Sequence, residues 1–249
     1  MQKGLLSTRA RPTAATAAKP VSETVGVALL EVVGMLLRLR VSLPDRPGVL
    51  GQVARAFGVM GADILQVTVL ERQAGRAVDD FTVFWPGLFE PGELRDRICV
   101  VPGARVESVW PTREAPGTSP DYDLLGHVAA EPERAVVTLV DAMPDVVSAE
   151  WAVAVDSGSG MVLHGSWQAP EDVSAADLTP LRASALTRDG LHLACVPMDG
   201  AHLVVAREQG PPFHQAELDK ISRLTGIVCA LVRSTTDREP RETQRSNTP

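Results

Sequence analysis

The spacing of the apolar residues changes abruptly at one short segment, and this change constrains the fold more than any other feature of the chain. Within residues 36–43, leucine or valine occupies every second position, at 37, 39, 41 and 43, and polar residues lie between them. This alternation predicts a strand with one buried face. The segment 44–48, Pro-Asp-Arg-Pro-Gly, ends the alternation. Apolar residues then recur at helical spacing, which predicts an amphipathic helix over residues 48–60 that ends at Gly61.

The residues after Gly61 extend this strand and helix into a complete unit. They predict, in order, a strand over 65–69, a hairpin turn at 73–76, a strand over 81–85, a helix over 93–100 and a strand over 104–110. The order is therefore βαββαβ. Because crossovers between parallel strands are right-handed, we expect both helices on one face of a four-stranded antiparallel sheet, which is the ferredoxin-like arrangement.

Two motifs in this first domain, residues 35–112, resemble those of the ACT domain family. The first is LPDRPGVL at 43–50, and the second is GADI at 61–64, which begins thirteen residues past Gly48. The resemblance implies a domain that senses an amino acid or a related metabolite, pairs with a second copy and binds its ligand where the paired domains meet. The ligand-binding residues expected from these motifs are Asp45, Arg46, Pro47, Gly48, Val49, Leu50, Gly61, Asp63 and Ile64.

The physical properties of the first motif favour the same function. Gly48 permits a tight turn from strand to helix and lets a ligand approach the backbone. The first N–H groups of the helix, at residues 49–51, have no partners within the helix and can receive a carboxylate. Asp45 precedes them and can bind an α-ammonium group. We expect Asp63 at the same end of the sheet as Asp45, because the first two strands run parallel.

A second interpretation of these residues requires no ligand. Asp45 can cap the helix or form an Asx turn, and residues 46–48 can serve the turn alone. Leu43 also stands where some amino-acid-binding members of the ACT family have a polar residue. Under this interpretation the domain is a dimerisation module that docks on a partner enzyme or regulator.

Charged residues are predicted on the sheet face that points away from the two helices. They are Arg38, Arg40, Asp80, Arg105 and Glu107. They form either cross-strand pairs on a solvated surface or a face that is buried against the partner sheet of a dimer. The sequence leaves both alternatives open.

A proline-rich segment separates this domain from a second one. Residues 111–121, PTREAPGTSPD, contain three prolines and no apolar period, so we expect a linker at 113–120. The second domain, 121–232, is predicted to begin with helices over 122–128 and 133–143, and Pro144 is expected to end the second helix. Strands over 149–155 and 161–167 and a mixed segment at 171–186 are expected next. The domain is expected to end with a hairpin of 191–197 with 201–207 and a closing helix over 215–232. The strand at 201–207 and the step into the closing helix resemble a small GAF-type sensor domain. The expected fold class is therefore α+β, with a GAF-like antiparallel sheet after the ferredoxin-like domain.

Both ends of the chain lack the pattern of a packed domain. We expect residues 1–34 to be a disordered arm, or an extension upstream of a translation start at Met35, and residues 233–249 to be a disordered tail. The apolar run 25–37 is too short for a membrane-spanning helix and contains Glu31, so we expect no membrane insertion.

Composition and motifs argue against several functional classes. The 24 basic against 31 acidic residues give a net charge of −7, which excludes a generally basic nucleic-acid binder. Three cysteines are too few for a disulfide framework and predict reduced thiols in a cytoplasmic protein. No nucleotide, hydrolase or metalloprotease motif is present, the five histidines do not converge, and adjacent Asp79 and Asp80 point to opposite faces of a strand. We therefore expect no catalytic residue, no metal and no cofactor.

The sequence thus predicts a non-enzymatic, cytoplasmic regulatory protein that forms a homodimer. Its expected ligand is a small amino-acid-like molecule, with neither nucleic acid nor membrane as a partner. The alternative is a ligand-free assembly module whose partner protein is unknown. An enzyme in the second domain is the third hypothesis.

Overall fold

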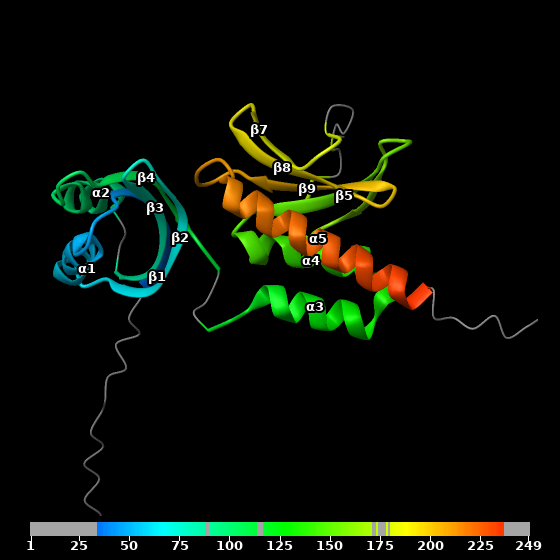
Figure 1. Ribbon diagram of the computed structural model, residues 1–249, viewed down its shortest axis with the longest axis horizontal. Helices are drawn as coiled ribbons and strands as arrows, with labels where there is room; N and C mark the ends of the chain where they lie inside the picture. Colours follow the sequence, from blue (N-terminus) through cyan, green and yellow to red (C-terminus); the bar gives the residue numbers. More distant parts are fainter. Residues whose placement is uncertain are drawn as a thin grey trace, which may run out of the picture. The chain divides into compact units, whose positions relative to one another are not determined.

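The structure, a computed structural model, describes residues 34–87, 90–113, 117–170, 173, 178 and 180–236. These residues form an α+β protein with two antiparallel sheets (Figure 1). The fold class predicted from the sequence is confirmed. The predictions for residues 1–33 and 237–249 lie outside the described residues, as does most of the mixed segment before residue 180.

The first sheet and its two helices form the predicted βαββαβ unit. Its elements are β1 (Gly34–Pro44), α1 (Val49–Val59), β2 (Asp63–Gln73), β3 (Arg76–Pro86), α2 (Pro91–Cys99) and β4 (Arg105–Pro111). The strand order is β2-β3-β1-β4, and both β1 and β2 pair antiparallel with β3. Helices α1 and α2 lie on one face of the sheet (Figure 1) and enclose a core of aliphatic and aromatic side chains from β1 and β3. This is the expected ferredoxin-like arrangement.

The edge strand β2 is less buried than its apolar alternation predicts. Val67 and Val69 lie on the helix side of the sheet, since they pair with Phe81 and Asp79 of β3. They are nevertheless 41% and 51% exposed, because β2 is at the edge of the sheet and the core lies mainly over the central strands. Two bulges also interrupt the pairing of β2 with β3.

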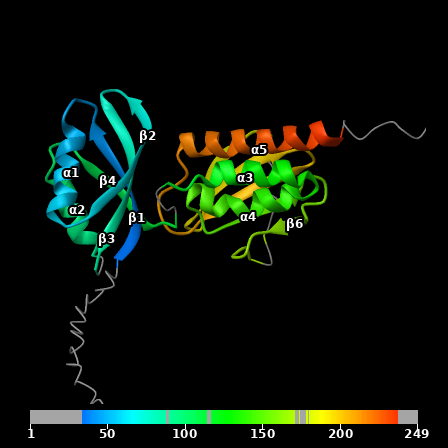
Figure 2. The same ribbon diagram turned by 90° about the horizontal axis from the view of Figure 1, so that it is seen from below.

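The second domain packs three helices on one face of a five-stranded sheet. Its elements are α3 (Pro120–Ala130), the short 3-10 helix η1 (Pro132–Arg134), α4 (Ala135–Val147), β5 (Trp151–Asp156), β6 (Val162–Gly165), β7 (Ser184–Arg188), β8 (Leu191–Met198), β9 (Ala201–Arg207) and α5 (Gln215–Thr236). The strand order is β6-β5-β9-β8-β7, with every pair antiparallel. Helices α3, α4 and α5 lie together (Figure 2) and share one core with alternate residues of β5, β8 and β9.

Two helices of this domain end later than predicted. The expectation that Pro144 ends a helix is wrong, because α4 continues to Val147. A proline inside a helix costs ~3 kcal/mol, and burial of Val146 and Val147 in the core offsets this loss. Helix α5 continues to Thr236, so residues 233–236 are helical rather than part of a disordered tail.

The charged face of the first sheet is covered by the same chain. Arg40 and Asp80 are each 2% exposed, and two hydrogen bonds of 2.8 and 2.9 Å join them. Arg40 also donates to Oε2 of Glu217 in α5 at 2.8 Å and to the backbone carbonyl of Pro212. Arg40 and Asp80 therefore form a cross-strand pair, as the first alternative expects, but the pair is buried against α5 of the same chain instead of lying on a solvated surface or against a partner sheet. At the edge strand β4, Arg105 and Glu107 are exposed, as a solvated surface predicts.

Glu217 also binds an arginine of the second sheet. Its Oε1 accepts a hydrogen bond of 2.7 Å from Arg207 of β9, so one carboxylate lies between two guanidinium groups. The ring of Trp110 in β4 packs against both guanidinium groups, each 5.7 Å from its centroid. We call Arg40, Asp80, Trp110, Arg207 and Glu217 the Glu217 cluster.

Charges within the Glu217 cluster control its ionisation. Burial opposes the ionised form of Glu217, but the charges of Arg207 and Arg40 outweigh it and lower the pKa of the carboxyl from 4.5 to about 2. Burial likewise opposes the charged form of Arg40, and its hydrogen bond to Asp80 and the charge of Glu217 outweigh that effect and raise its pKa. Both groups therefore remain ionised at neutral pH.

Replacing Glu217 by glutamine is expected to lower the free energy of unfolding by about 3 kcal/mol at pH 7, because two buried guanidinium groups lose their shared anion. Urea denaturation measures this difference. Glu208→Gln is the matched control, since Glu208 is exposed and precedes the same helix. The control is expected to change the free energy by less than about 0.5 kcal/mol.

The effect of Glu217→Gln depends on pH in a defined direction. The folded-state pKa of Glu217 lies below its unfolded-state value, so the stabilisation is fully present above about pH 4.5 and is lost as the pH falls toward about 2. The stabilities of the wild type and the variant are therefore expected to converge over this range. Curves that stay parallel down to pH 2.5 would contradict the assigned role of Glu217.

Candidate functional site

A hollow of about 370 Å³ lies beside the start of α1. It is formed by the end of β1, the loop that follows it and facing residues of β2 and β3. We call it the α1 hollow, and its lining residues are Leu43, Pro44, Asp45, Arg46, Pro47, Val49, Leu50, Val69, Arg72, Ala77 and Asp79. Five of the nine predicted ligand-binding residues are among them, namely Asp45, Arg46, Pro47, Val49 and Leu50.

The N-terminus of α1 beside this hollow has open backbone donors. Gly48 precedes the helix with a φ of 88°, a left-handed conformation that favours glycine, and no side chain caps the helix. Among the described residues, the N–H groups of Leu50 and Gly51 have no hydrogen-bond acceptor. The predicted alternative in which Asp45 caps this helix is therefore wrong. These donors and the positive end of the helix dipole suit an anionic group.

Asp45 is already bound to an arginine within the chain. Its two carboxylate oxygens accept hydrogen bonds of 2.9 and 3.1 Å from the guanidinium of Arg72 in β2. This contact raises the pKa of Arg72. The role expected for Asp45, binding an α-ammonium group, would require a ligand to compete with this two-point contact.

Asp79 is the acidic residue of the hollow that lacks such a partner. It is 2% exposed, and its Oδ1 has no hydrogen-bond donor among the described residues. Burial raises the pKa of its carboxyl, the neighbouring carboxylates of Asp80 and Asp45 raise it further, and Arg72 partly opposes them. A buried carboxylate oxygen without a donor is costly and calls for an explanation.

The sequence motifs do not indicate Asp79, although the alternation along β3 does contain a signal. Ala77, Phe81, Val83 and Trp85 form the row of β3 residues that faces the helices, and Asp79 occupies the same row. A charged residue in an otherwise apolar row is the pattern that distinguishes it. Its neighbour Asp80 faces the other side and belongs to the Glu217 cluster, as the predicted divergence of the two acids requires.

The second motif lies at the opposite end of the sheet. Asp63 pairs with Phe84, whereas Leu43 at the hollow pairs with Ala77. Ala77 and Phe84 are seven positions apart along β3, roughly 23 Å at ~3.3 Å per residue. The expectation that Asp63 lies beside Asp45 is wrong because α1 carries the chain back along the sheet before the parallel strand β2 begins. Gly61 and Ile64 are displaced from the hollow for the same reason.

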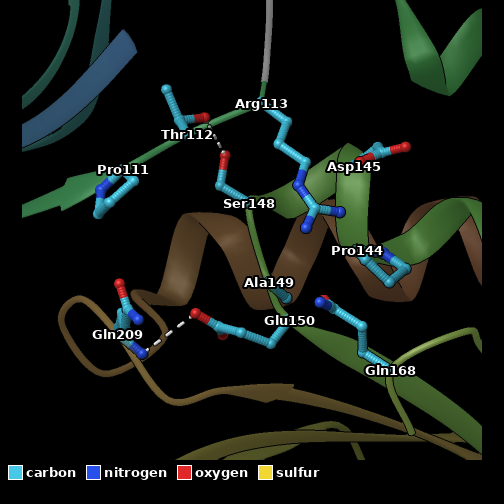
Figure 3. A pocket seen from close by; sticks show the side chains of 10 residues that line it. All are labelled: Pro111, Thr112, Arg113, Pro144, Asp145, Ser148, Ala149, Glu150, Gln168 and Gln209. Atoms are coloured by element: carbon cyan, nitrogen blue, oxygen red, sulfur yellow. Dashed lines mark hydrogen bonds between the residues drawn. The ribbon is translucent and has the colours of Figure 1, made fainter. Parts of the chain in front are cut away.

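A second hollow, of about 230 Å³, lies where the chain leaves β4 (Figure 3). Arg113 extends into it, and the other lining residues are Pro111, Thr112, Pro144, Asp145, Ser148, Ala149, Glu150, Gln168 and Gln209. Several of its polar groups already bind one another. The hydroxyls of Thr112 and Ser148 lie 2.9 Å apart, and Glu150 accepts the N–H groups of residues 208 and 209. These bonds hold chain segments together, which makes the α1 hollow the stronger candidate for a binding site.

Three histidines of the second domain contact separate partners. His164 contacts Asp141, His192 contacts Thr187, and His202 contacts Ser157. In the part of the chain that the structure describes, no three metal-ligating side chains gather into a candidate metal site. No helix of that part is long and apolar enough to cross a membrane.

Comparisons with known proteins find similarity in solved structures only. No protein-family model and no curated protein matches the chain. The chain is similar to a GAF domain from an Acinetobacter phosphoenolpyruvate-protein phosphotransferase (11% identity over 50% of this chain and 99% of the other, TM-score 0.37). It is also similar to a formyltetrahydrofolate deformylase from Pseudomonas putida (15%, 38% and 38%, 0.28) and to the regulatory subunit of aspartate kinase from Thermus thermophilus (12%, 81% and 95%, 0.25). These likenesses are distant and do not bear on what the α1 hollow binds.

The adjacent acids of β3 are expected to respond oppositely to neutralisation. Asp79→Asn removes an unpaired buried charge and is expected to raise the free energy of unfolding at pH 7. Asp80→Asn is expected to lower it by about 3 kcal/mol, because it breaks a buried ion pair with Arg40. Urea denaturation of both variants measures the contrast.

The gain from Asp79→Asn is expected to depend on pH. The folded-state pKa of Asp79 lies above its unfolded-state value of 3.8, so its penalty is present above the raised pKa and disappears as the pH falls toward 3.8. If Asp79→Asn is instead less stable than the wild type at pH 7, the carboxylate of Asp79 has a stabilising hydrogen-bond partner in the absence of a ligand.

Proposed function

We propose that this chain is a non-enzymatic regulatory protein whose first domain binds an amino acid or a similar small metabolite in the α1 hollow. The observation that carries the proposal is the open helix start beside a cavity of about 370 Å³. The free N–H groups of Leu50 and Gly51 suit the carboxylate of such a ligand. The aliphatic side chains of Leu43, Val49 and Val69 suit its apolar part.

Arg46 supports the same assignment. Arg46 is exposed, and it lines the hollow next to the start of α1. A cation and free N–H groups at one end of a small hollow favour an anionic group over a neutral one. Arg72 contributes less to this end, because Asp45 already neutralises it.

A route to the second domain runs through β3. Asp79 lines the hollow, and the next residue, Asp80, binds Arg40, which binds Glu217 of α5. A ligand that bound more tightly to one arrangement of β3 would thereby bias the contact with α5. We infer that the second domain relays or anchors the signal in this way.

Pairing of two copies is part of the proposal and also the alternative function. Val67 and Val69 give the edge strand β2 an exposed apolar side, and an edge strand presents unpaired backbone groups to another chain. Because Val69 lines the hollow, a partner on β2 would lie next to the ligand. If the hollow binds nothing, this edge still supports a ligand-free pairing module.

Isothermal titration of the full chain with the twenty amino acids is expected to detect ligand binding. Binding is expected to weaken at least tenfold in the variant Val69→Trp, because the larger tryptophan side chain fills the hollow. Val59→Trp is the control, since Val59 is exposed at the other end of α1 and does not line the hollow. Absence of binding at millimolar concentration to the wild type would refute the sensing function.

Pairing is expected to depend on the β2 edge. Val67→Lys places a charge on the exposed apolar strand and is expected to shift a wild-type dimer toward the monomer in sedimentation velocity. Val100→Lys, at an exposed position after α2, is the control. A wild-type monomer at all accessible concentrations would rule out both homodimer hypotheses.

A further inference from the structure

The α1 hollow contains a buried carboxylate for which the described residues supply no hydrogen-bond donor. Asp79 lies on β3 between the core strand β1 and the edge strand β2, where it pairs with Val41 and Val69. Aliphatic neighbours on both sides offer no donor to its carboxylate. Its Oδ1 has no hydrogen bond among the described residues, and the residue is 2% exposed.

The cations nearest to Asp79 are engaged or placed elsewhere. Arg72 makes its two-point contact with Asp45. Arg40 lies on the opposite face of the sheet, where it binds Asp80 and Glu217. Arg46 lines the hollow from the exposed loop at the start of α1 and donates no hydrogen bond to Oδ1 of Asp79. The hollow thus holds a buried anion with room beside it instead of a partner.

A ligand bound in the hollow can supply a partner for this carboxylate. A buried carboxylate is stabilised most by a donor that also carries positive charge. The space beside it is small, since about 370 Å³ equals roughly a dozen water volumes at ~30 Å³ each. Its other walls are largely aliphatic, with Leu43, Val49 and Ala77 among them. A small primary ammonium group on an aliphatic body meets all of these conditions.

We propose that Asp79 binds the ammonium group of the ligand, so that the α1 hollow selects aliphatic primary amines, with or without a carboxylate, over carboxylic acids that lack an amine. This inference rests on the proposed function and adds its specificity-determining residue. The residue that binds the ammonium group is then Asp79, which lies outside both motifs, and not Asp45, which the first motif suggests. Amino acids and simple aliphatic amines share this ammonium chemistry, and the experiment separates them.

The test uses matched probes that differ by one charged group. Leucine carries both groups, 3-methylbutylamine carries the amine alone, and 4-methylpentanoate carries the carboxylate alone. Alanine, ethylamine and propionate form a second, smaller set. Each is titrated into the full-length wild type, Asp79→Asn and Asp96→Asn at pH 7.5, by calorimetry and by chemical-shift changes of the β3 amides.

The expected result is binding of at least one amine-containing probe, with the matching carboxylate at least about tenfold weaker, and a loss of about tenfold or more in Asp79→Asn. Asp96→Asn is the control, since Asp96 is exposed on α2 and does not line the hollow, and it is expected to bind like the wild type. Binding of the amine without its carboxylate identifies simple amines as the source, whereas binding of leucine or alanine alone identifies amino acids.

Two outcomes would overturn the inference, and they are distinguishable. If a carboxylate probe binds as tightly as its amino acid and Asp79→Asn changes nothing, Asp79 is not the recognition residue, although the proposed sensing function stands. If no amine, amino acid or carboxylate binds the wild type at 10 mM, both the inference and the sensing function fail. Denaturation of Asp79→Asn, which is expected to be at least as stable as the wild type, shows that lost binding is not lost folding.

Discussion

One carboxylate, that of Glu217, lies between two arginines that belong to different sheets. A buried charge is costly unless it is paired, and here each pairing requires the others. Arg40 needs Asp80 and Glu217, and Arg207 needs Glu217 together with backbone carbonyls at the end of α4. The start of α5 is therefore held at the charged face of the first sheet. This contact explains why that face is closed to both solvent and a partner.

The two adjacent acids of β3 connect this cluster with the candidate site. Asp80 is buried and compensated by Arg40, whereas Asp79 is buried and left without a donor. Strand geometry alone sends them to opposite faces of the sheet. The same short segment thus contributes one charge to stability and one to the hollow. A structure that retains an uncompensated charge beside an open cavity is typical of a binding site, where local stability is exchanged for recognition.

The sequence motifs predict only part of the candidate site. Five of residues 45–50 line the hollow, because a glycine turn before a helix has the same local geometry wherever it occurs, but their expected contact with a ligand stays a prediction. The grouping of Asp63 with Asp45 failed, because strand direction and the path of α1 must be combined to place two distant residues. The engagement of Asp45 by Arg72 and the isolation of Asp79 were not predictable, since both depend on the register of β2 against β3.

The apolar periodicity of the chain was sufficient for the ferredoxin-like first domain and for the β8–β9 hairpin, because these depend on contacts between residues close in sequence or on the handedness of crossovers. It did not predict β7 (Ser184–Arg188), which begins inside the segment expected to be mixed. Tertiary packing was needed to carry α4 through Pro144, to expose the valines of β2 and to bury Arg40 against α5. It also left the buried carboxylate oxygen Oδ1 of Asp79 without a hydrogen-bond donor among the described residues. These outcomes depend on contacts between different elements, such as the one between Arg40 and Glu217, and the local sequence pattern contains no information about such contacts.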